Sequence, residues 1–121
     1  MDIRRGDIFI ATLDPALGSE ISKTRPVLIA SNNQNNRFSA TVTVLPITSG
    51  NLGRIYPFEV FLAAGVGNLP KDSKAKADQI RTVDKARLVK RIGKLNKREM
   101  DLVGNAMAIH LALSLDTAGG S

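Results

Sequence analysis

The sequence predicts a mainly β protein with helices (α+β), in which a small, strongly bent sheet precedes a C-terminal helix. Two observations support this fold class. Short runs rich in Val, Ile, Phe and Thr recur through residues 7–95, and Gly, Pro or Asn separates them. Sustained helical spacing of apolar residues is found at the end of the chain, after residue 95.

Four predicted elements fill the first part of the chain. Residues 7–13 are apolar and β-prone and end at an Asp-Pro turn signal, so they predict a strand. Residues 16–24 mix Gly, Ser, Glu and Lys without a period, which predicts a loop. Residues 26–30 are apolar and too few for a helix, which indicates a buried strand. The Asn-rich stretch 31–36 is interpreted as a polar turn with no side chain suited to packing.

The middle of the chain continues with strands. Residues 41–45 alternate with period two and predict a third strand, which we expect to stop at Pro46 because proline interrupts a sheet ladder. Residues 58–62 predict a fourth strand, and the Gly-rich stretch 64–70 predicts a connection.

The segment 74–83 is ambiguous, because its Ala and Lys residues favour a helix. Ile80 and Val83, followed by Asp84, instead indicate a strand that leads into a helical turn capped by Asp84. Residues 89–95 predict one more short strand.

The last element is a predicted helix that begins after Asn96. Asn96 and Glu99 have the spacing of a capping box, in which each side chain bonds the other's backbone N–H. Four apolar residues follow at helical spacing: Met100, Val103, Met107 and Leu111. We expect this helix to reach about Leu115 and residues 116–121 to form a flexible tail, so residues 1–115 make one domain.

The composition indicates the cellular compartment in which the protein works. The sequence has no cysteine, which excludes disulfides, thiolate zinc sites and cysteine nucleophiles and fits a reducing compartment. It has no apolar stretch of membrane-spanning length and no apolar signal segment at its start. We therefore expect a cytoplasmic protein that does not enter a membrane.

The charge is basic and unevenly distributed. Seventeen Lys and Arg residues against eleven Asp and Glu residues give a formal net charge of +6. Residues 1–70 hold six basic and five acidic residues, whereas residues 71–121 hold eleven basic and six acidic residues. Such an excess favours a polyanionic partner, nucleic acid or an acidic protein segment, although a solvated basic face explains the composition equally well.

Several catalytic classes lack the residues they need. The single histidine, His110, lies within the predicted helix and has no partner for acid–base work. The carboxylates are scattered without metal-binding spacing, and no Gly-rich phosphate loop precedes a Lys-Ser/Thr pair. We therefore expect no metal and no cofactor.

One reaction suits the remaining residue types. In RNA the 2′-OH can attack the neighbouring phosphate and give a 2′,3′-cyclic phosphate and a free 5′-OH end, so the protein needs only to orient the substrate and stabilise charge. An arginine fork matches two phosphate oxygens, and a Thr or Ser hydroxyl can donate to a third. Arg25 at the start of a buried strand and Thr48 at the end of another are placed for these tasks. Taken alone, these two residues are better explained by a surface ion pair for Arg25 and a turn for Thr48.

Six motifs occur along the chain with a recognisable spacing. They are Arg5-Gly6-Asp7-Ile8, Gly18-Ser19-Glu20, Arg25-Pro26-Val27-Leu28, Pro46-Ile47-Thr48, Tyr56-Pro57-Phe58-Glu59-Val60 and Asp78-Gln79-Ile80-Arg81-Thr82-Val83-Asp84. Together they resemble the MazF/PemK family of toxins over nearly the whole chain, to about Leu115.

The resemblance implies an SH3-like small barrel with a C-terminal helix, and a homodimer. It also implies the toxin of a type II toxin–antitoxin system, a metal-independent endoribonuclease (an mRNA interferase) that cuts single-stranded RNA at a preferred sequence. A cognate acidic antitoxin is expected to occupy the RNA groove. The alternative is a non-enzymatic toxin of the same fold that poisons DNA gyrase.

The resemblance further implies roles for six residues. Arg25 and Thr48 match the family's catalytic arginine and threonine, and Glu20 matches a loop acid linked to activity. Three more positions match the RNA-binding groove: Ser19, Gln79 and Arg81.

The general base is left open. Arg25 is a poor base because its guanidinium stays protonated in proteins. We assign Arg25 to charge stabilisation and to proton donation to the leaving 5′-oxygen. Glu20, a water molecule or a transiently neutral Arg25 are the candidates for accepting the 2′-OH proton.

Overall fold

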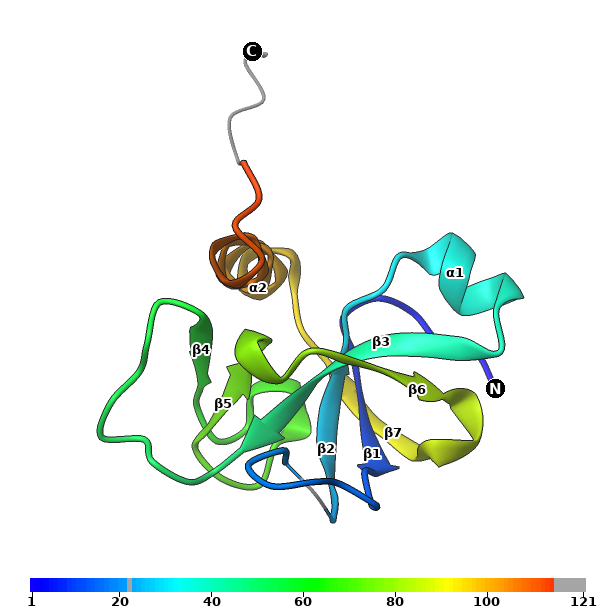
Figure 1. Ribbon diagram of the computed structural model, residues 1–121, viewed down its shortest axis with the longest axis horizontal. Helices are drawn as coiled ribbons and strands as arrows, with labels where there is room; N and C mark the ends of the chain where they lie inside the picture. Colours follow the sequence, from blue (N-terminus) through cyan, green and yellow to red (C-terminus); the bar gives the residue numbers. More distant parts are fainter. Residues whose placement is uncertain (22, 115–121) are drawn as a thin grey trace.

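The computed structural model describes residues 1–21 and 23–114, and within them the chain forms a seven-stranded antiparallel sheet and a C-terminal helix (Figure 1). The strands are β1 (Asp7–Thr12), β2 (Thr24–Ile29), β3 (Thr41–Thr48), β4 (Glu59–Leu62), β5 (Ser73–Lys76), β6 (Arg81–Asp84) and β7 (Leu88–Lys94). The helices are α1 (Asn33–Phe38) and α2 (Lys97–His110), with short 3-10 turns η1 (Val66–Asn68), η2 (Ala77–Gln79) and η3 (Lys85–Arg87). The predicted fold class is confirmed.

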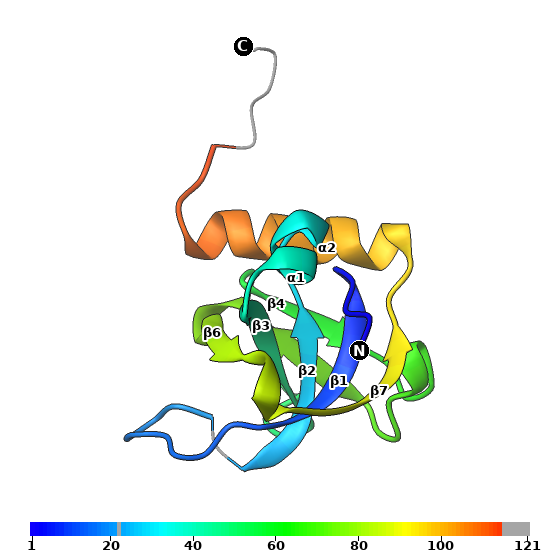
Figure 2. The same cartoon turned by 90° about the vertical axis from the view of Figure 1, so that its right-hand side faces the viewer.

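The sheet curls but does not close. Its strand order is β4-β5-β3-β2-β1-β7, with β6 paired to β3. Among the described residues no ladder joins β4 to β7, so the small barrel is open between these two strands. Figure 2 shows α2 lying across one end of the curled sheet.

Both faces of the central strands are buried, because successive residues enter two different apolar clusters. In β1, Ile8 belongs to the cluster beneath α2, and Phe9 belongs to the cluster on the opposite face. In β2, Leu28 and Val27 divide in the same way. The helix covers the first cluster with Val103, which is fully buried. Burying an apolar side chain of this size contributes on the order of 2 kcal/mol, so this two-sided core fixes the strand register.

The prediction that the third strand stops at Pro46 is wrong, since β3 continues to Thr48. One edge of β3 pairs with β6 as far as Val44 and then with β5 from Ile47. Pro46 lies between these two ladders, where the absence of an N–H donor interrupts neither of them. The proline therefore marks the bend at which β3 passes from one part of the sheet to the other.

The Asn-rich stretch is a helix and not a turn. Asn32 caps α1, because its side chain accepts a hydrogen bond from the backbone N–H of Asn35 at 2.8 Å. Asn36 is only 2% exposed and donates to the Ser31 carbonyl at 2.9 Å. The expectation that no side chain here could pack is wrong, because hydrogen bonding to Ser31 lets this amide be buried.

The C-terminal helix begins as predicted and ends earlier. The capping box of Asn96 and Glu99 is formed in both directions. However, α2 ends at His110 and not near residue 115, because Ala112 adopts a left-handed backbone (φ 56°). The N–H of Leu113 donates to the Ala108 carbonyl at 2.8 Å, which is the terminating bond of a Schellman motif.

The strand and the capped turn predicted around Val83 and Asp84 are both present. Strand β6 leads into η3, and the Asp84 side chain caps that turn by accepting from the Ala86 N–H at 2.8 Å.

Neither helix of the described residues combines the length and hydropathy that crossing a bilayer requires. The predicted tail, 116–121, lies outside the described residues.

Candidate active site

The ladder between β2 and β3 positions Arg25 and Thr48. Val27 is the partner of Pro46 in this antiparallel register. Extending the register by two residues places Arg25 opposite Thr48. Arg25 is the second residue of β2 and Thr48 the last residue of β3, so both belong to rigid strands at the edge of a loop.

Arg25 and Thr48 line the same pocket, whose volume is about 280 Å³. The pocket wall comprises Arg25, Pro26, Ile47, Thr48, Ser49, Leu69, Pro70, Lys71 and Ser73. Ile47 and Leu69 are buried members of the core beneath α2, so the pocket has an apolar floor. Its two basic side chains make the wall suited to an anion.

The hydroxyl of Thr48 is oriented by its own loop. Its Oγ1 accepts a hydrogen bond from the Gly50 backbone N–H at 3.1 Å. A hydroxyl that accepts one bond still has its own hydrogen to donate. Thr48 is half-buried, so this donor is accessible to a ligand in the pocket.

Gln79 contacts the loop that carries Ser19 and Glu20. Gln79 of η2 accepts from the Ile21 N–H at 3.3 Å and donates to the Ser19 carbonyl at 3.5 Å. Glu20 turns back on its own loop, since its Oε1 accepts from the Leu17 N–H at 2.7 Å. Gln79 therefore fastens the loop between β1 and β2 to the sheet.

Arg81 makes a different contact. It is half-buried on β6, and its Nη1 donates to the Leu13 carbonyl at 3.3 Å. This bond ties β6 to the end of β1. None of Ser19, Glu20, Gln79 and Arg81 lines the pocket of Arg25 and Thr48, so the pocket brings together only two of the six predicted site residues.

A buried charge cluster lies beside the pocket, and sequence reasoning missed it. The Lys74 ammonium lies 3.0 Å from Glu59 Oε1, and the two side chains are 3% and 0% exposed. Lys76 contacts the other oxygen, Glu59 Oε2, at 2.5 Å and Asp78 Oδ1 at 3.5 Å. The signal was present in the sequence, because Lys74 and Lys76 alternate along one strand, but their partner became clear only from the β4–β5 register.

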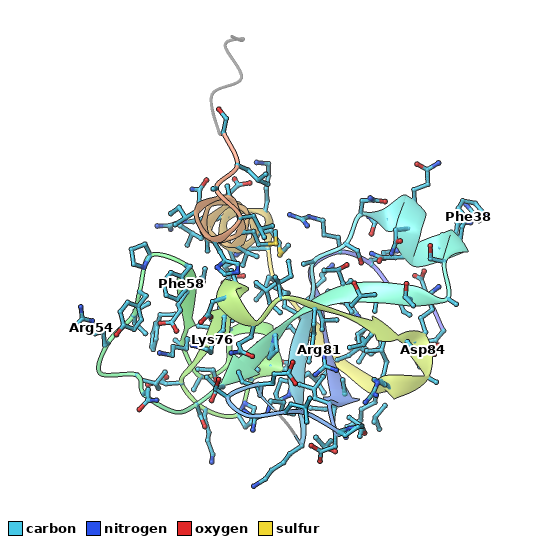
Figure 3. All side chains as sticks on the ribbon, viewed as in Figure 1. Phe38, Arg54, Phe58, Lys76, Arg81 and Asp84 are labelled. Carbon is cyan, nitrogen blue, oxygen red and sulfur yellow. The ribbon has the colours of Figure 1, made fainter. Side chains whose placement is uncertain are left out.

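The cluster also shapes the segment that follows Thr48. The Lys74 ammonium donates to the carbonyls of Asn51 at 2.9 Å and Arg54 at 3.1 Å. Together with Glu59, these acceptors satisfy all three of its hydrogens. The segment 49–58 is thus held to β5. In Figure 3 the Arg54 side chain lies at the outer edge of this segment, where its guanidinium stacks 4.9 Å from the Tyr56 ring centroid.

The electrostatics of the cluster follow from these contacts. Burial raises the pKa of Glu59, but hydrogen bonds from Lys76, the Tyr56 backbone and Lys74 outweigh it and lower that pKa below its usual value. Burial lowers the pKa of Lys76, while the Glu59 hydrogen bond and the Asp78 charge raise it overall. Both groups are therefore charged at neutral pH.

The arrangement suits anion handling more than metal chemistry. The described residues contain no group of three or more His, Cys, Asp or Glu side chains that could hold a metal ion. The pocket presents a guanidinium and a hydroxyl instead, which are hydrogen-bond donors to phosphate oxygens.

Residues 4–111 match the model of the PemK-like, MazF-like toxins of type II toxin–antitoxin systems. The chain belongs to this family. Among its relatives, endoribonuclease MazF9 of Mycobacterium tuberculosis is 39% identical over 92% of this chain and 98% of its own length. Endoribonuclease EndoA of Bacillus subtilis is 41% identical over 93% of this chain and 97% of its own length.

The fold is similar to that of a chain in a solved MazE–MazF structure. A chain from the MazE–MazF crystal structure of Deinococcus radiodurans has a TM-score of 0.74 and 25% identity, over 94% of this chain and 99% of that one. The predicted family is confirmed. The alternative of a gyrase poison finds no support, since both sequence relatives are named endoribonucleases.

Proposed function

We propose that this protein is the toxin of a type II toxin–antitoxin pair and cuts single-stranded mRNA as an endoribonuclease in the cytoplasm. The observation that carries this function is the common pocket of Arg25 and Thr48 at neighbouring strand ends. Membership of the toxin family and the endoribonuclease relatives support it.

In the proposed reaction the substrate supplies its own nucleophile. The 2′-oxygen of one ribose attacks the adjacent phosphorus, and the bond from phosphorus to the 5′-oxygen of the next nucleotide breaks. The 2′-OH proton passes to a base, and the 5′-oxygen takes up a proton as it leaves. The products are a 2′,3′-cyclic phosphate and a 5′-OH end, and no water is consumed.

Arg25 and Thr48 stabilise the charge that develops on phosphorus. The Arg25 fork donates to two phosphate oxygens, and the Thr48 hydroxyl donates to another. Because both side chains project from paired strands, they reach the transition state with little reorganisation. Arg25 also supplies the proton to the 5′-oxygen.

The loop between β1 and β2 holds the RNA beside this pocket. Ser19 and Gln79 are already bonded to each other through the Ser19 carbonyl, and each retains hydrogen-bonding atoms for a base or phosphate. Glu20 is the candidate on this loop for the general base, with water and transiently neutral Arg25 as its competitors. Arg81 adds positive charge to the RNA path.

A homodimer is proposed through the outer face of α2 and β4. Leu102 is 50% exposed, Ile109 is 52% exposed and Phe61 of β4 is 47% exposed. Leu102 and Ile109 are seven residues apart and share a helix face. Apolar side chains that are this exposed to solvent favour contact with a partner protein. A second copy of the chain is that partner in the homodimer that the family resemblance implies.

A cognate antitoxin is proposed to compete with RNA. The MazE–MazF pair of Deinococcus radiodurans shows that a similar fold is bound by an antitoxin. The net charge of +6 favours an acidic segment, which would occupy the anion-binding pocket in place of RNA.

One experiment tests the proposed function. Purified protein is incubated with a defined single-stranded RNA in excess EDTA, and both new ends are mapped. The function predicts cleavage that persists in chelator and leaves 5′-OH ends. Cleavage that requires metal, or that leaves 5′-phosphate ends, would contradict it.

A further inference from the structure

A separate pocket of about 570 Å³ lies beside α1, at the other end of β3 from Thr48. Its wall includes three basic side chains, Arg4, Arg37 and Lys85, together with Phe38 and the amides of Asn33 and Gln34. We call it the α1 pocket. It shares no residue with the pocket of Arg25 and Thr48.

The α1 pocket is electropositive. Arg4 is paired with Asp2 at 3.1 Å. Lys85 is half-buried, and no carboxylate or other acceptor of the described residues engages its ammonium. Arg37 stacks on Phe38 but forms no ion pair within the same residues. Asp2 is the one carboxylate of the pocket wall, and it is paired with Arg4. The cations of the wall therefore outnumber its carboxylate, which favours an anionic ligand.

Phe38 gives the pocket a flat apolar surface. Its ring is 73% exposed, and the Arg37 guanidinium lies 5.2 Å from the ring centroid. Exposing an aromatic ring to water is unfavourable. Beside an arginine, however, the ring provides a surface on which a nucleobase stacks. An acidic peptide would use the cations and leave this ring without a role.

The amide of Asn33 completes the recognition chemistry. Its Oδ1 accepts from the Arg5 backbone N–H at 2.7 Å and from Asn36 Nδ2 at 3.4 Å. These bonds orient the side chain, and no acceptor of the described residues takes its own Nδ2 hydrogens. A base edge or phosphate in the pocket would supply that acceptor. The buried Asn36 holds α1 in place, so the pocket is preformed.

We propose that the α1 pocket binds a second part of the same single-stranded RNA, outside the sequence that is cut. This inference rests on the proposed function. The eight residues of β3 separate the two pockets by roughly 25 Å. Figure 3 shows Phe38 at the opposite end of the molecule from Arg54, which lies on the segment after Thr48. An RNA held at both ends would bind more tightly than a short one.

The test compares two RNAs that share one cleavage sequence. One is limited to that sequence, and the other has unstructured flanks long enough to reach along β3, roughly 25 Å. Four proteins are measured: wild type, Arg37→Ala/Lys85→Ala, Phe38→Ala and Lys90→Ala. Lys90 is an exposed cation of β7 that does not line the α1 pocket, so it controls for net charge. Thermal melts check that each protein is folded.

The proposal predicts that kcat/KM falls for the long RNA and not for the short one. Both pocket variants should lower kcat/KM for the long RNA about tenfold and leave the short RNA unchanged, while Lys90→Ala changes neither. For the double variant, the slope of log affinity against log salt should fall by about 1.4 for the long RNA, which is two phosphate contacts on a single strand.

Three outcomes would overturn it. An equal fall in kcat/KM for both RNAs in the pocket variants would mean that α1 affects the active site through the fold. No loss on either would mean that the pocket does not bind RNA. Binding of a polyglutamate peptide that Arg37→Ala/Lys85→Ala abolishes, with long-RNA cleavage intact, would assign the pocket to a protein partner. If wild type cut neither RNA, the proposed function itself would fail.

Discussion

Arg25 on β2 and Thr48 on β3 lie opposite each other in the extension of one antiparallel ladder and line a single pocket. The two residues are far apart in the sequence, and neither strand end by itself indicates a catalytic site. Their juxtaposition follows from the register, which the two-sided core enforces through residues such as Val27 and Leu28. A transition state with charge on several phosphate oxygens can therefore receive donors from two strands at once.

The first prediction concerns the Thr48 hydroxyl. Thr48→Ala should slow single-turnover cleavage at least tenfold, because a donor to the transition state is lost. Thr48→Ser should be milder, since the hydroxyl remains and only the methyl group is removed. A rate for Thr48→Ser as low as that of Thr48→Ala would show that the methyl group, and not the hydrogen bond, matters.

The second prediction concerns the substrate nucleophile. Replacing the ribose on the 5′ side of the scissile phosphate with deoxyribose should abolish cleavage, because no 2′-OH remains to attack. Binding, measured by competition with the all-ribose strand, should change little. Efficient cutting of the substituted strand would point to a water or protein nucleophile.

The third prediction concerns the buried cluster. Lys74→Met should lower the free energy of unfolding by on the order of 3 kcal/mol, because it leaves Glu59 short of a charge partner and frees two loop carbonyls. Lys97→Met is the matched control, since the pair of Lys97 with Asp101 is exposed and should contribute little. Equal denaturant midpoints for the two variants would contradict a structural role for the cluster.

The same cluster predicts a pH dependence with a defined sign. The pKa of Glu59 is lower in the folded protein than its ordinary value of 4.5, so its contribution to stability is present above pH 4.5 and is lost as the pH falls below it. The stability difference between wild type and Glu59→Gln should therefore shrink in acid. A difference that stayed constant from neutral pH to pH 3 would exclude this assignment.

The fourth prediction concerns the loop between β1 and β2. Gln79→Ala removes both bonds to this loop, at Ser19 and Ile21, and should raise KM more than it lowers kcat, because the loop loses its preformed position. Hydrogen exchange of residues 16–21 should increase. Unchanged exchange and KM would mean that Gln79 does not hold the loop for RNA.

Local patterns predicted the elements well where they had a single physical cause. The period-two run before Pro46 and the Asn96–Glu99 capping box each gave the correct type of element. The errors arose where a distant partner decided the outcome. Pro46 is accommodated only because β5 and β6 take different parts of β3, and Asn36 is buried only because Ser31 meets it.

The candidate site shows the same division. Arg25 and Thr48 could be singled out as strand-end donors, and the family resemblance paired them. The contact between Gln79 and Ser19 joins residues sixty positions apart, so only the folded structure reveals it. The role of Lys74 could not be foreseen, because a lysine in a short strand is expected to be exposed. Only the register, which places Lys74 between Phe61 of β4 and Thr48 of β3, brings its ammonium within reach of Glu59.

The catalytic assignment of Arg25 is tested most directly by single-turnover cleavage at saturating protein, with a thermal melt of each variant. Arg25→Ala should keep the fold and lower the rate by on the order of a hundredfold or more, because the lost interaction forms only in the transition state. Arg25→Lys should also lose much of the rate, since an ammonium retains the charge without the two-pronged donor. Full activity in a folded Arg25→Ala protein would contradict the mechanism proposed for this pocket.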